Sequence, residues 1–206
     1  MPRVSEEHLE RRRQQILDAA QLCFARKGFH ETSMQDVFAE SQMSAGAVYR
    51  YFTSKNEIIG ALVQRTMGPL RERLAEIIHS EPTPPPAEVV RLLTTEIVKR
   101  TGPEGPLRLA PQAWALALVS PEAGTAVRTG IASMRELWRE YGVALRELGW
   151  LPADADVEVF AKTIIGLLPG FILQHLLLED VTPADFASGV AMLFPVTPPA
   201  AVVGER

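Results

Sequence analysis

Apolar residues recur at helical spacing along most of the chain, and no segment shows the strict alternation of a half-buried strand. The first helix is predicted to begin at Ser5, with acidic residues in its first turn, and to end at Gly28. Its buried stripe follows the spacing i, i+3, i+4, i+7 through Ile16, Ala19, Ala20 and Cys23. The chain is therefore predicted to open with an amphipathic helix.

The same spacing continues between turn-forming residues over the rest of the chain. Further helices are predicted after Ser33 and at about 45–51, 54–79, 87–100, 107–119, 121–148, 155–179 and 183–194. Pro69 lacks an N–H donor and should kink the helix at 54–79. With about nine helices and no sheet, the chain is predicted to be all-α. The expected division is a three-helix domain at 1–53, a larger helical domain at 54–195 and a flexible tail at 196–206.

Residues 32–57 contain three helix starts around one short turn. Ser33 with Asp36 forms one capping-box pair, and Ser54 with Glu57 forms another. Between them, Ser44 can cap a second short helix that follows the turn at 41–43. Two short helices joined in this way can place the second helix in the DNA major groove.

The second short helix has the side chains that this role requires. Ala45, Gly46 and Ala47 are too small to hold its first turn away from base edges. Tyr49 and Arg50 are long enough to reach bases or phosphates. A guanidinium can pair with guanine or with a phosphate, and both roles stay open for Arg50.

These segments resemble the DNA-binding domain of the tetracycline-repressor (TetR) family. The family pattern has Thr-Ser/Thr, then Gly-Val-Ser-x-Gly-x-x-Tyr-x-x-Phe, then Ser-Lys-x-x-Leu. The matching residues here are Thr32-Ser33, Ser44 to Phe52 and Ser54 to Ile58, with 16–20 and 24–29 upstream. The resemblance covers roughly residues 11–63. It departs from the pattern at Gln42, where the family usually has glycine; a left-handed conformation there would cost on the order of 1 kcal/mol.

The resemblance implies a set of DNA contacts. Tyr49 and Lys55 are expected at the DNA backbone, and Tyr51, at a position where the family often has histidine, at a phosphate. Backbone N–H groups at helix N-termini can also bind phosphate, and Ser33 and Ser44 begin two of these helices. The full set of expected DNA-binding residues is Thr32, Ser33, Ser44, Ala45, Gly46, Tyr49, Arg50, Tyr51 and Lys55.

The net charge of the chain does not by itself indicate DNA binding, but the distribution of charge along the chain is informative. The net charge of the chain is −4, whereas residues 1–60 sum to zero and 61–206 carry the excess acid. A neutral DNA reader must therefore concentrate its positive charge on one face. Arg11, Arg12 and Arg13 are expected to be exposed, either as a solvated face or as phosphate contacts.

Composition narrows the class of protein. Cys23 is the only cysteine, which excludes an internal disulfide and a cysteine-cluster metal site. The longest apolar run, 164–173, is too short to span a bilayer, and no apolar secretory segment follows Met1. We therefore expect a cytoplasmic protein without a membrane span, metal or cofactor. The P-loop, dinucleotide-binding, zinc-protease and serine-elbow motifs are absent, so we do not expect an enzyme.

The C-terminal helices hold aromatic and polar residues in apolar surroundings. Core packing and an apolar ligand pocket both fit this pattern. The candidate effector-binding residues are Arg108, Gln112, Trp114, Met134, Trp138, Tyr141, Phe171 and His175. The predicted helix at 155–179 is apolar nearly all round, which in a chain of this size indicates a second subunit. The candidate dimer-interface residues are Ile164, Leu167, Gly170, Phe171 and Leu178.

In the TetR family the last two long helices form a four-helix dimer interface, which agrees with that placement. The leading prediction is a homodimeric transcriptional repressor that binds double-stranded DNA at a palindromic operator and is released by a small apolar effector. The alternatives are a helical enzyme with a site assembled from distant residues, and a constitutive DNA-bound scaffold without an effector.

Overall fold

The computed structural model describes residues 6–194, and all regular secondary structure in that range is helical. Within that range there are ten α-helices and one short 3-10 helix. Counting α8 and α9 as one interrupted helix gives the nine that were predicted. The tail predicted at 196–206 lies outside the described residues.

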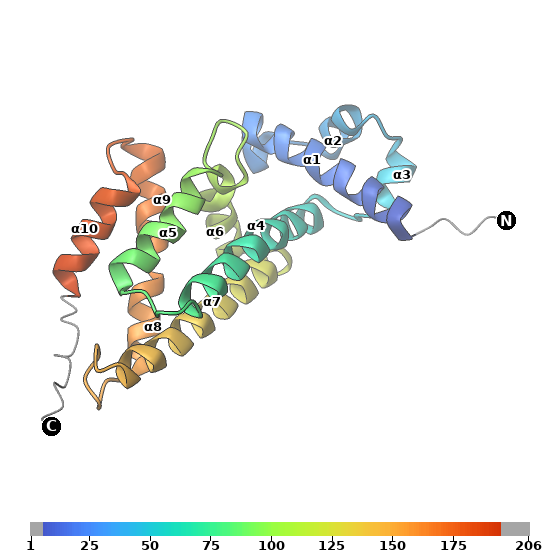
Figure 1. The fold of residues 1–206 in the computed structure, drawn as a ribbon. Helices are drawn as coiled ribbons and strands as arrows, with labels where there is room; N and C mark the ends of the chain where they lie inside the picture. The colour runs from blue at the N-terminus through green and yellow to red at the C-terminus, as the bar shows by residue number, and fades with distance from the viewer. Residues whose placement is uncertain (1–5, 195–206) are drawn as a thin grey trace, which may run out of the picture. The chain divides into compact units, whose positions relative to one another are not determined.

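The chain forms two compact units, and Figure 1 shows the order of their elements. Unit 1 comprises residues 1–68 and 99–130, and unit 2 comprises 69–98 and 131–206. The N-terminal helices are therefore in one unit with a later segment of the chain, so unit 1 is larger than the domain predicted at 1–53.

Unit 1 is built around the N-terminal helices. Its elements are α1 (Glu6–Glu31), α2 (Met34–Ser41), α3 (Ala45–Tyr49), the first part of α4 (Lys55–Ile78), η1 (Pro106–Leu109), α6 (Ala110–Val119) and the start of α7 (Pro121–Glu147). One buried apolar cluster joins α1 to the helices after it through Ile16, Leu17, Phe24, Val37, Val48, Phe52, Ile58, Leu109 and Ala113. This core, rather than helix propensity, holds α2 and the five-residue α3 in place.

Unit 2 contains the C-terminal helices. Its elements are the rest of α4, α5 (Pro86–Val98), the rest of α7, α8 (Val157–Ile165), α9 (Leu167–Leu177) and α10 (Pro183–Leu193). Aromatic rings make its core, with Trp138 against Tyr141 at 5.9 Å and Phe171 against Phe186 at 5.2 Å between ring centroids. The Tyr141 hydroxyl donates to the Pro84 carbonyl at 2.5 Å.

The single helix predicted at 155–179 is wrong in one respect, because it is interrupted at Gly166. Pro169 has no N–H to donate to the Ile165 carbonyl, so the regular bonding cannot continue through this turn. The N–H of Gly166 instead bonds to the Thr163 carbonyl at 3.1 Å in a tighter turn. The predicted short helix at 45–51 also ends earlier, at Tyr49.

Most predicted helix ends are confirmed because they depend on local capping. Ser33 with Asp36, and Thr182 with Asp185, form complete capping boxes. Gly28 interrupts α1 with φ 77° and ψ 171°, a conformation that glycine adopts without steric cost. A Cβ at Gly28 would also lie only 3.0 Å from Oε1 of Gln112.

Gln42 ends α2 in the left-handed conformation, with φ 55° and ψ 32°. Its backbone N–H lies 3.2 Å from the Ala39 carbonyl, and Met43 N lies 3.2 Å from the Phe38 carbonyl. The turn between the two short helices therefore has a glycine-like backbone occupied by glutamine.

Replacing Gln42 with glycine should stabilise the protein by about 0.5–1 kcal/mol, because the Cβ strain of the left-handed conformation is removed. The measurement is urea unfolding at matched protein concentration. Gln42→Ala is the control: it removes the side chain but keeps the Cβ, and should bring no such gain. A less stable glycine variant would show that side-chain contacts outweigh the strain.

Candidate nucleic-acid interface

The start of α2 is tightly defined by hydrogen bonds. The Ser33 N–H and hydroxyl both donate to Asp36 Oδ2, at 2.8 and 2.7 Å, and the Ser33 hydroxyl oxygen accepts from the Asp36 N–H at 3.2 Å. Lys27 also donates to this carboxylate at 2.5 Å. The Lys27 ammonium and the Ser33 donors hold the pKa of Asp36 well below its usual range. Asp36 therefore keeps its charge, and with it the capping box, in mildly acidic solution.

The first turn of α3 is uncovered. Ser44 caps it by accepting from the Ala47 N–H at 3.3 Å. Ser44, Ala45 and Gly46 are all exposed, and a Cβ added at Gly46 would meet nothing within 4 Å. This turn can therefore approach a groove without side chains in the way.

The other end of α3 presents long side chains. Tyr49 is exposed and packs its ring edge-on against Phe38, at 5.4 Å between centroids. Arg50 is exposed and forms no ion pair within residues 6–194. Tyr51 is half-buried against the unit 1 core. Five of the six exposed members of the predicted DNA-binding set lie along this short helix and its caps, and the sixth, Ser33, caps α2. The five are Ser44, Ala45, Gly46, Tyr49 and Arg50.

Thr32 does not belong to this surface. Its side chain is only 1% exposed, and its hydroxyl donates to the Gly28 carbonyl at 2.7 Å. The Cys23 carbonyl oxygen lies 3.3 Å from the same hydroxyl. The predicted DNA contact of the Thr32 side chain is therefore corrected: it closes the end of α1.

Lys55 also has a structural role that its predicted phosphate contact did not anticipate. Its ammonium donates to the carbonyls of Phe29 at 2.7 Å, Thr32 at 2.8 Å and His30 at 3.3 Å. An ammonium has three N–H donors, and all three point at carbonyls at the end of α1. The phosphate contact of Lys55 stays a prediction, and it would require the ammonium to leave one of these carbonyls.

Two further side chains hold α2 and α4 against α1, and they were not predicted from the sequence. Gln15 donates to the Ser41 carbonyl at 2.7 Å and so holds the end of α2 against α1. Arg65 on α4 donates to Asp18 at 2.6 Å, Gln21 at 2.8 Å and Gln14 at 3.1 Å, all on α1. Helical spacing could have shown that these α1 residues share a face, but no local signal pairs them with residue 65.

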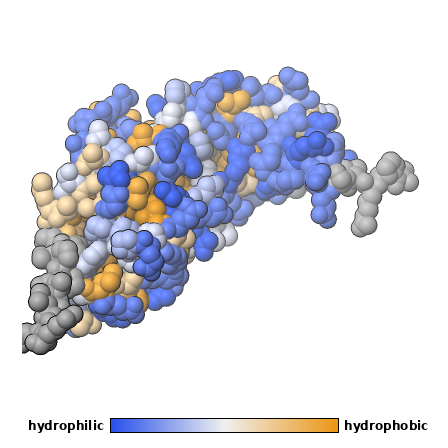
Figure 2. Space-filling model, in the orientation of Figure 1, coloured by the Kyte–Doolittle hydropathy of each residue, from blue (hydrophilic) through white to orange (hydrophobic). Residues whose placement is uncertain are grey.

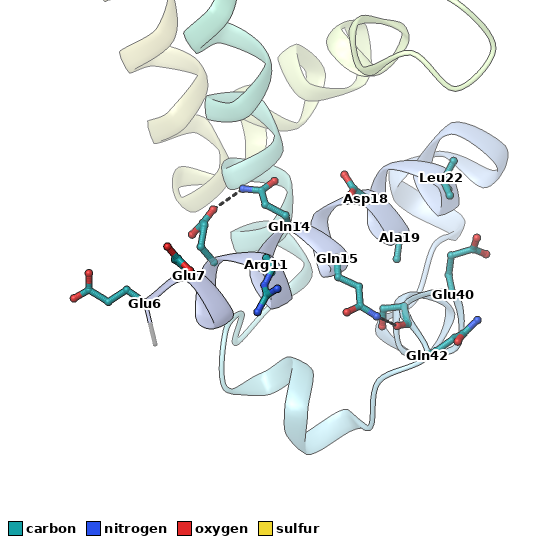
Figure 3. A pocket seen from close by; sticks show the side chains of 12 residues that line it. Glu6, Glu7, Arg11, Gln14, Gln15, Asp18, Ala19, Leu22, Glu40 and Gln42 are labelled. Atoms are coloured by element: carbon teal, nitrogen blue, oxygen red, sulfur yellow. Dashed lines mark hydrogen bonds between the residues drawn. The ribbon is translucent and has the colours of Figure 1, made fainter. Parts of the chain in front are cut away.

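The surface around α1 and α2 carries two hollows of opposite charge. The larger, about 930 Å³, is lined by five acidic residues against one arginine, Arg11 (Figure 3). The acidic residues are Glu6, Glu7, Glu10, Asp18 and Glu40. The smaller hollow, about 320 Å³, lies beside α3 and has Arg12 and Arg50 among its lining residues but no acid. A DNA backbone is attracted to the second and repelled by the first.

The predicted effector-binding residues are divided between the two units. Arg108, Gln112 and Trp114 belong to unit 1, whereas Met134, Trp138, Tyr141, Phe171 and His175 belong to unit 2. Gln112 is occupied structurally, since its Oε1 accepts from the Phe29 N–H at 2.8 Å. Trp114 packs against the unit 1 core, and Arg108 is exposed. The ligand role predicted for Gln112 is therefore corrected to a contact between α6 and α1.

The predicted dimer residues also differ in exposure. Ile164 and Phe171 are fully buried within the chain, so they are core residues and not interface residues. Leu167 and Gly170 are half-buried, and Leu178 is exposed. The ring of Phe171 is stacked on His175 at 5.6 Å, which places His175 in the same core.

An exposed short helix at the end of a two-helix turn defines a helix-turn-helix DNA-binding protein, and comparison with known proteins agrees. A family model described as "Bacterial regulatory proteins, tetR family" matches residues 16–62. A second, described as "BetI-type transcriptional repressor, C-terminal", matches residues 86–193, which is more than half of the chain. The chain belongs to the TetR family of transcriptional regulators.

Individual relatives support the same family. Over 63 residues the chain is 44% identical to the HTH-type transcriptional regulator YfiR of Bacillus subtilis, so the match spans 31% of each chain. GusR of Salmonella enterica has the same fold, with a TM-score of 0.75 and 19% identity over 94% of this chain and all of that one. A structure of AibR in complex with isovaleryl coenzyme A and operator DNA has a TM-score of 0.65 and 20% identity, over 90% of this chain and all of that one.

Replacing Lys55 with methionine should destabilise the protein by about 1–3 kcal/mol, because carbonyls at the end of α1 lose their donors. Among folded molecules, the salt dependence of duplex affinity should stay unchanged if the ammonium keeps these carbonyls in the complex with DNA. The measurements are chemical unfolding and fluorescence anisotropy with duplex DNA at several salt concentrations.

Lys27→Met, which removes a solvent-exposed partner of Asp36, is the control for the loss of a lysine near α2 and should destabilise less. If Lys55→Met instead kept full stability and lowered the salt slope by about 1, Lys55 would be a phosphate contact.

Proposed function

We propose that the chain represses transcription as a homodimer bound to a palindromic operator, and that a small apolar ligand releases it. The observation that carries the proposal is the apolar surface left exposed by the C-terminal helices. Leu177 is 75% exposed, Met192 80% and Leu193 70%. Large exposed apolar patches on one chain mark interaction surfaces.

The exposed residues lie on adjacent helices. α9 and α10 are joined by the contact between Phe171 and Phe186, so Leu177 and Leu178 on one side and Met192 and Leu193 on the other belong to neighbouring elements. Figure 2 shows apolar surface over unit 2, whereas the surface of α1 to α3 is largely hydrophilic. This supports a second copy of the chain as the partner that covers α9 and α10.

The segment Val157–Leu177 is strongly apolar, but only 28% of its most apolar window is buried within the chain. By length and composition alone it would also suit a membrane span. The family match instead places these residues in the C-terminal domain of a transcriptional repressor. In a dimer, the C-terminal domain of the second copy covers the apolar side chains that one chain leaves exposed in this segment.

A symmetric dimer determines the form of the operator. Two α3 helices related by a two-fold axis read two inverted half-sites, spaced by about one helical turn. The operator proposed for this chain is therefore a palindrome. The AibR structure, which holds operator DNA and a ligand together, supports the view that this fold accommodates both.

Unit 2 has one feature that favours a ligand. Trp138 is fully buried, and its indole N–H has no hydrogen-bond partner within residues 6–194. An unpaired buried donor costs about 1–3 kcal/mol, and a ligand carrying an acceptor would recover part of that. Tyr141 beside it stays neutral even in alkaline solution, because burial raises the pKa of its hydroxyl further above its ordinary value. The ligand that suits these surroundings is an apolar molecule with a single hydrogen-bond acceptor for the Trp138 N–H.

The ligand acts only if it prefers one state of the protein over another. α4 and α7 each contribute residues to both units, so a change in unit 2 can be transmitted along their backbones. By linkage, operator DNA must weaken ligand binding by the same factor as the ligand weakens DNA binding.

Replacing Leu177 with glutamate should convert the dimer to monomer, because a charge would enter the apolar interface. Sedimentation velocity at micromolar concentration measures this. Leu118→Glu is the matched control: Leu118 is 88% exposed, lies on α6 in unit 1 and should leave the dimer intact. A wild-type chain that sediments as a monomer would rule out the dimer.

Replacing Trp138 with phenylalanine should weaken effector binding by about 2- to 10-fold, because the ring is kept and one hydrogen bond is lost. Apolar metabolites and drugs are titrated against tryptophan fluorescence, with and without an operator selected from random DNA. Trp114→Phe, in unit 1, is the control and should bind as the wild type does. Ligand affinity that is equal with and without operator would refute ligand-driven release.

A further inference from the structure

The three consecutive arginines of α1 lie in three different environments. Arg11 lines the acidic hollow, among five carboxylates. The Arg13 guanidinium lies 5.3 Å from the centroid of the Phe52 ring and 3.9 Å from a carboxylate oxygen of Glu10. Arg12 lines the smaller hollow beside α3. Of the three arginines, only Arg12 therefore lies in the hollow beside α3.

The smaller hollow brings together elements that are far apart in the sequence. His8 and Arg12 come from α1, Met43 from the turn, and Arg50 and Tyr51 from the end of α3 and the residue after it. No carboxylate lines it. The hollow is therefore a cationic surface that forms only when α1, the turn and α3 are folded together.

Neither guanidinium is neutralised by its surroundings. Arg12 donates to the neutral amide oxygen of Gln15 at 2.9 Å, and within the described range neither Arg12 nor Arg50 forms an ion pair. Arg12 and Arg50 both line this hollow, and two like charges brought close together repel each other unless an anion lies between them. Guanidiniums bind phosphate oxygens through charge-assisted hydrogen bonds. The hollow therefore suits a phosphate.

We propose that Arg12 and Arg50 together hold one backbone phosphate of the operator in this hollow, which makes the first turns of α1 part of the DNA interface. The inference rests on the proposed operator binding. It assigns Arg50 to the phosphate rather than to a base, so sequence preference comes from the uncovered first turn of α3.

The position of the hollow also orients the DNA. Gln42 lines both hollows, so the cationic and acidic surfaces meet at the turn. A backbone that enters the cationic hollow and avoids the acidic one must follow the side of the reader formed by α3 and the first turns of α1.

The test is a double-variant cycle on the full chain. Arg12→Ala, Arg50→Ala and the double variant are titrated by fluorescence anisotropy against a duplex selected from random DNA and against an unrelated duplex, at several salt concentrations. Each single variant should lose affinity about tenfold for both duplexes, because a phosphate contact carries no sequence information. The double variant should lose less than the product of the two single losses.

The salt dependence distinguishes one shared phosphate from two separate ones. For one phosphate, the slope of log affinity against log salt should fall by about 0.9 per bound protomer in the double variant, and by less in each single variant. Two separate contacts would lower it by about 1.8 in the double variant.

The controls are matched to Arg12. Arg11→Ala removes the same charge one residue away, in the acidic hollow, and should stay within about threefold of the wild type. Arg12→Lys keeps the charge and should preserve most of the slope. Thermal unfolding checks that the exposed substitutions leave the fold intact.

The outcomes that overturn the proposal are distinct. If Arg12→Ala behaves as Arg11→Ala does, or if the cycle is additive, the shared phosphate is refuted while operator binding stands. If Arg50→Ala weakens only the selected duplex, with an unchanged slope, Arg50 contacts a base. If the wild-type chain prefers no duplex, the proposed operator binding itself fails.

Discussion

The arrangement of α1, α2 and α3 depends on the hydrogen bonds that satisfy the backbone between Gly28 and Thr32. This segment leaves the regular helical path of α1 and would expose polar groups at a half-buried site. Lys55 from α4 satisfies carbonyls, Gln112 from α6 accepts the Phe29 N–H, and Thr32 closes onto Gly28. Two helices, α4 and α6, are therefore tied to one stretch of five residues at the end of α1. The path of the chain into α2, and so the presentation of α3, follows from it.

The same hydrogen bonds explain why unit 1 contains a late segment of the chain. α6 is distant from α1 in sequence, yet Gln112 reaches the α1 backbone and Leu109 and Ala113 enter the N-terminal core. Arg65 adds a second tie, from α4 to three polar residues of α1. A change at α4 or α6 is consequently a change at the support of the reader, which is what a regulated DNA-binding protein requires.

Local signals in the sequence predicted the helix starts well, because Ser33, Ser44 and Thr182 cap helices through bonds to residues three positions away. The sequence left the conformation of Gln42 open, because glutamine stands where the family usually has glycine, and the structure shows that the left-handed turn is kept. The structural contacts of Lys55 and Gln112 were missed for the opposite reason. Their partners are backbone atoms 23 to 83 residues away, and backbone atoms leave no trace in residue types. The apolar pattern at 155–179 predicted one helix covered by a second subunit, but it could not separate Phe171, inside the protomer, from Leu177, on its surface.

A DNA-binding domain with no net charge is physically workable because part of its basic side chains is paired with acids inside the fold, while others stay free to act outside it. Lys27 pairs with Asp36, and Arg26 pairs with Glu40, so these charges stabilise the fold and contribute little field outside it. Arg12 and Arg50, which form no ion pair within residues 6–194, lie beside α3, while five acidic residues line the hollow on the other side of the turn. The net charge of zero at residues 1–60 does not reveal this separation of positive and negative side chains. Because a polyanion responds to the local field within roughly 10 Å, the placement of two arginines outweighs the balance of all sixteen charged residues at 1–60.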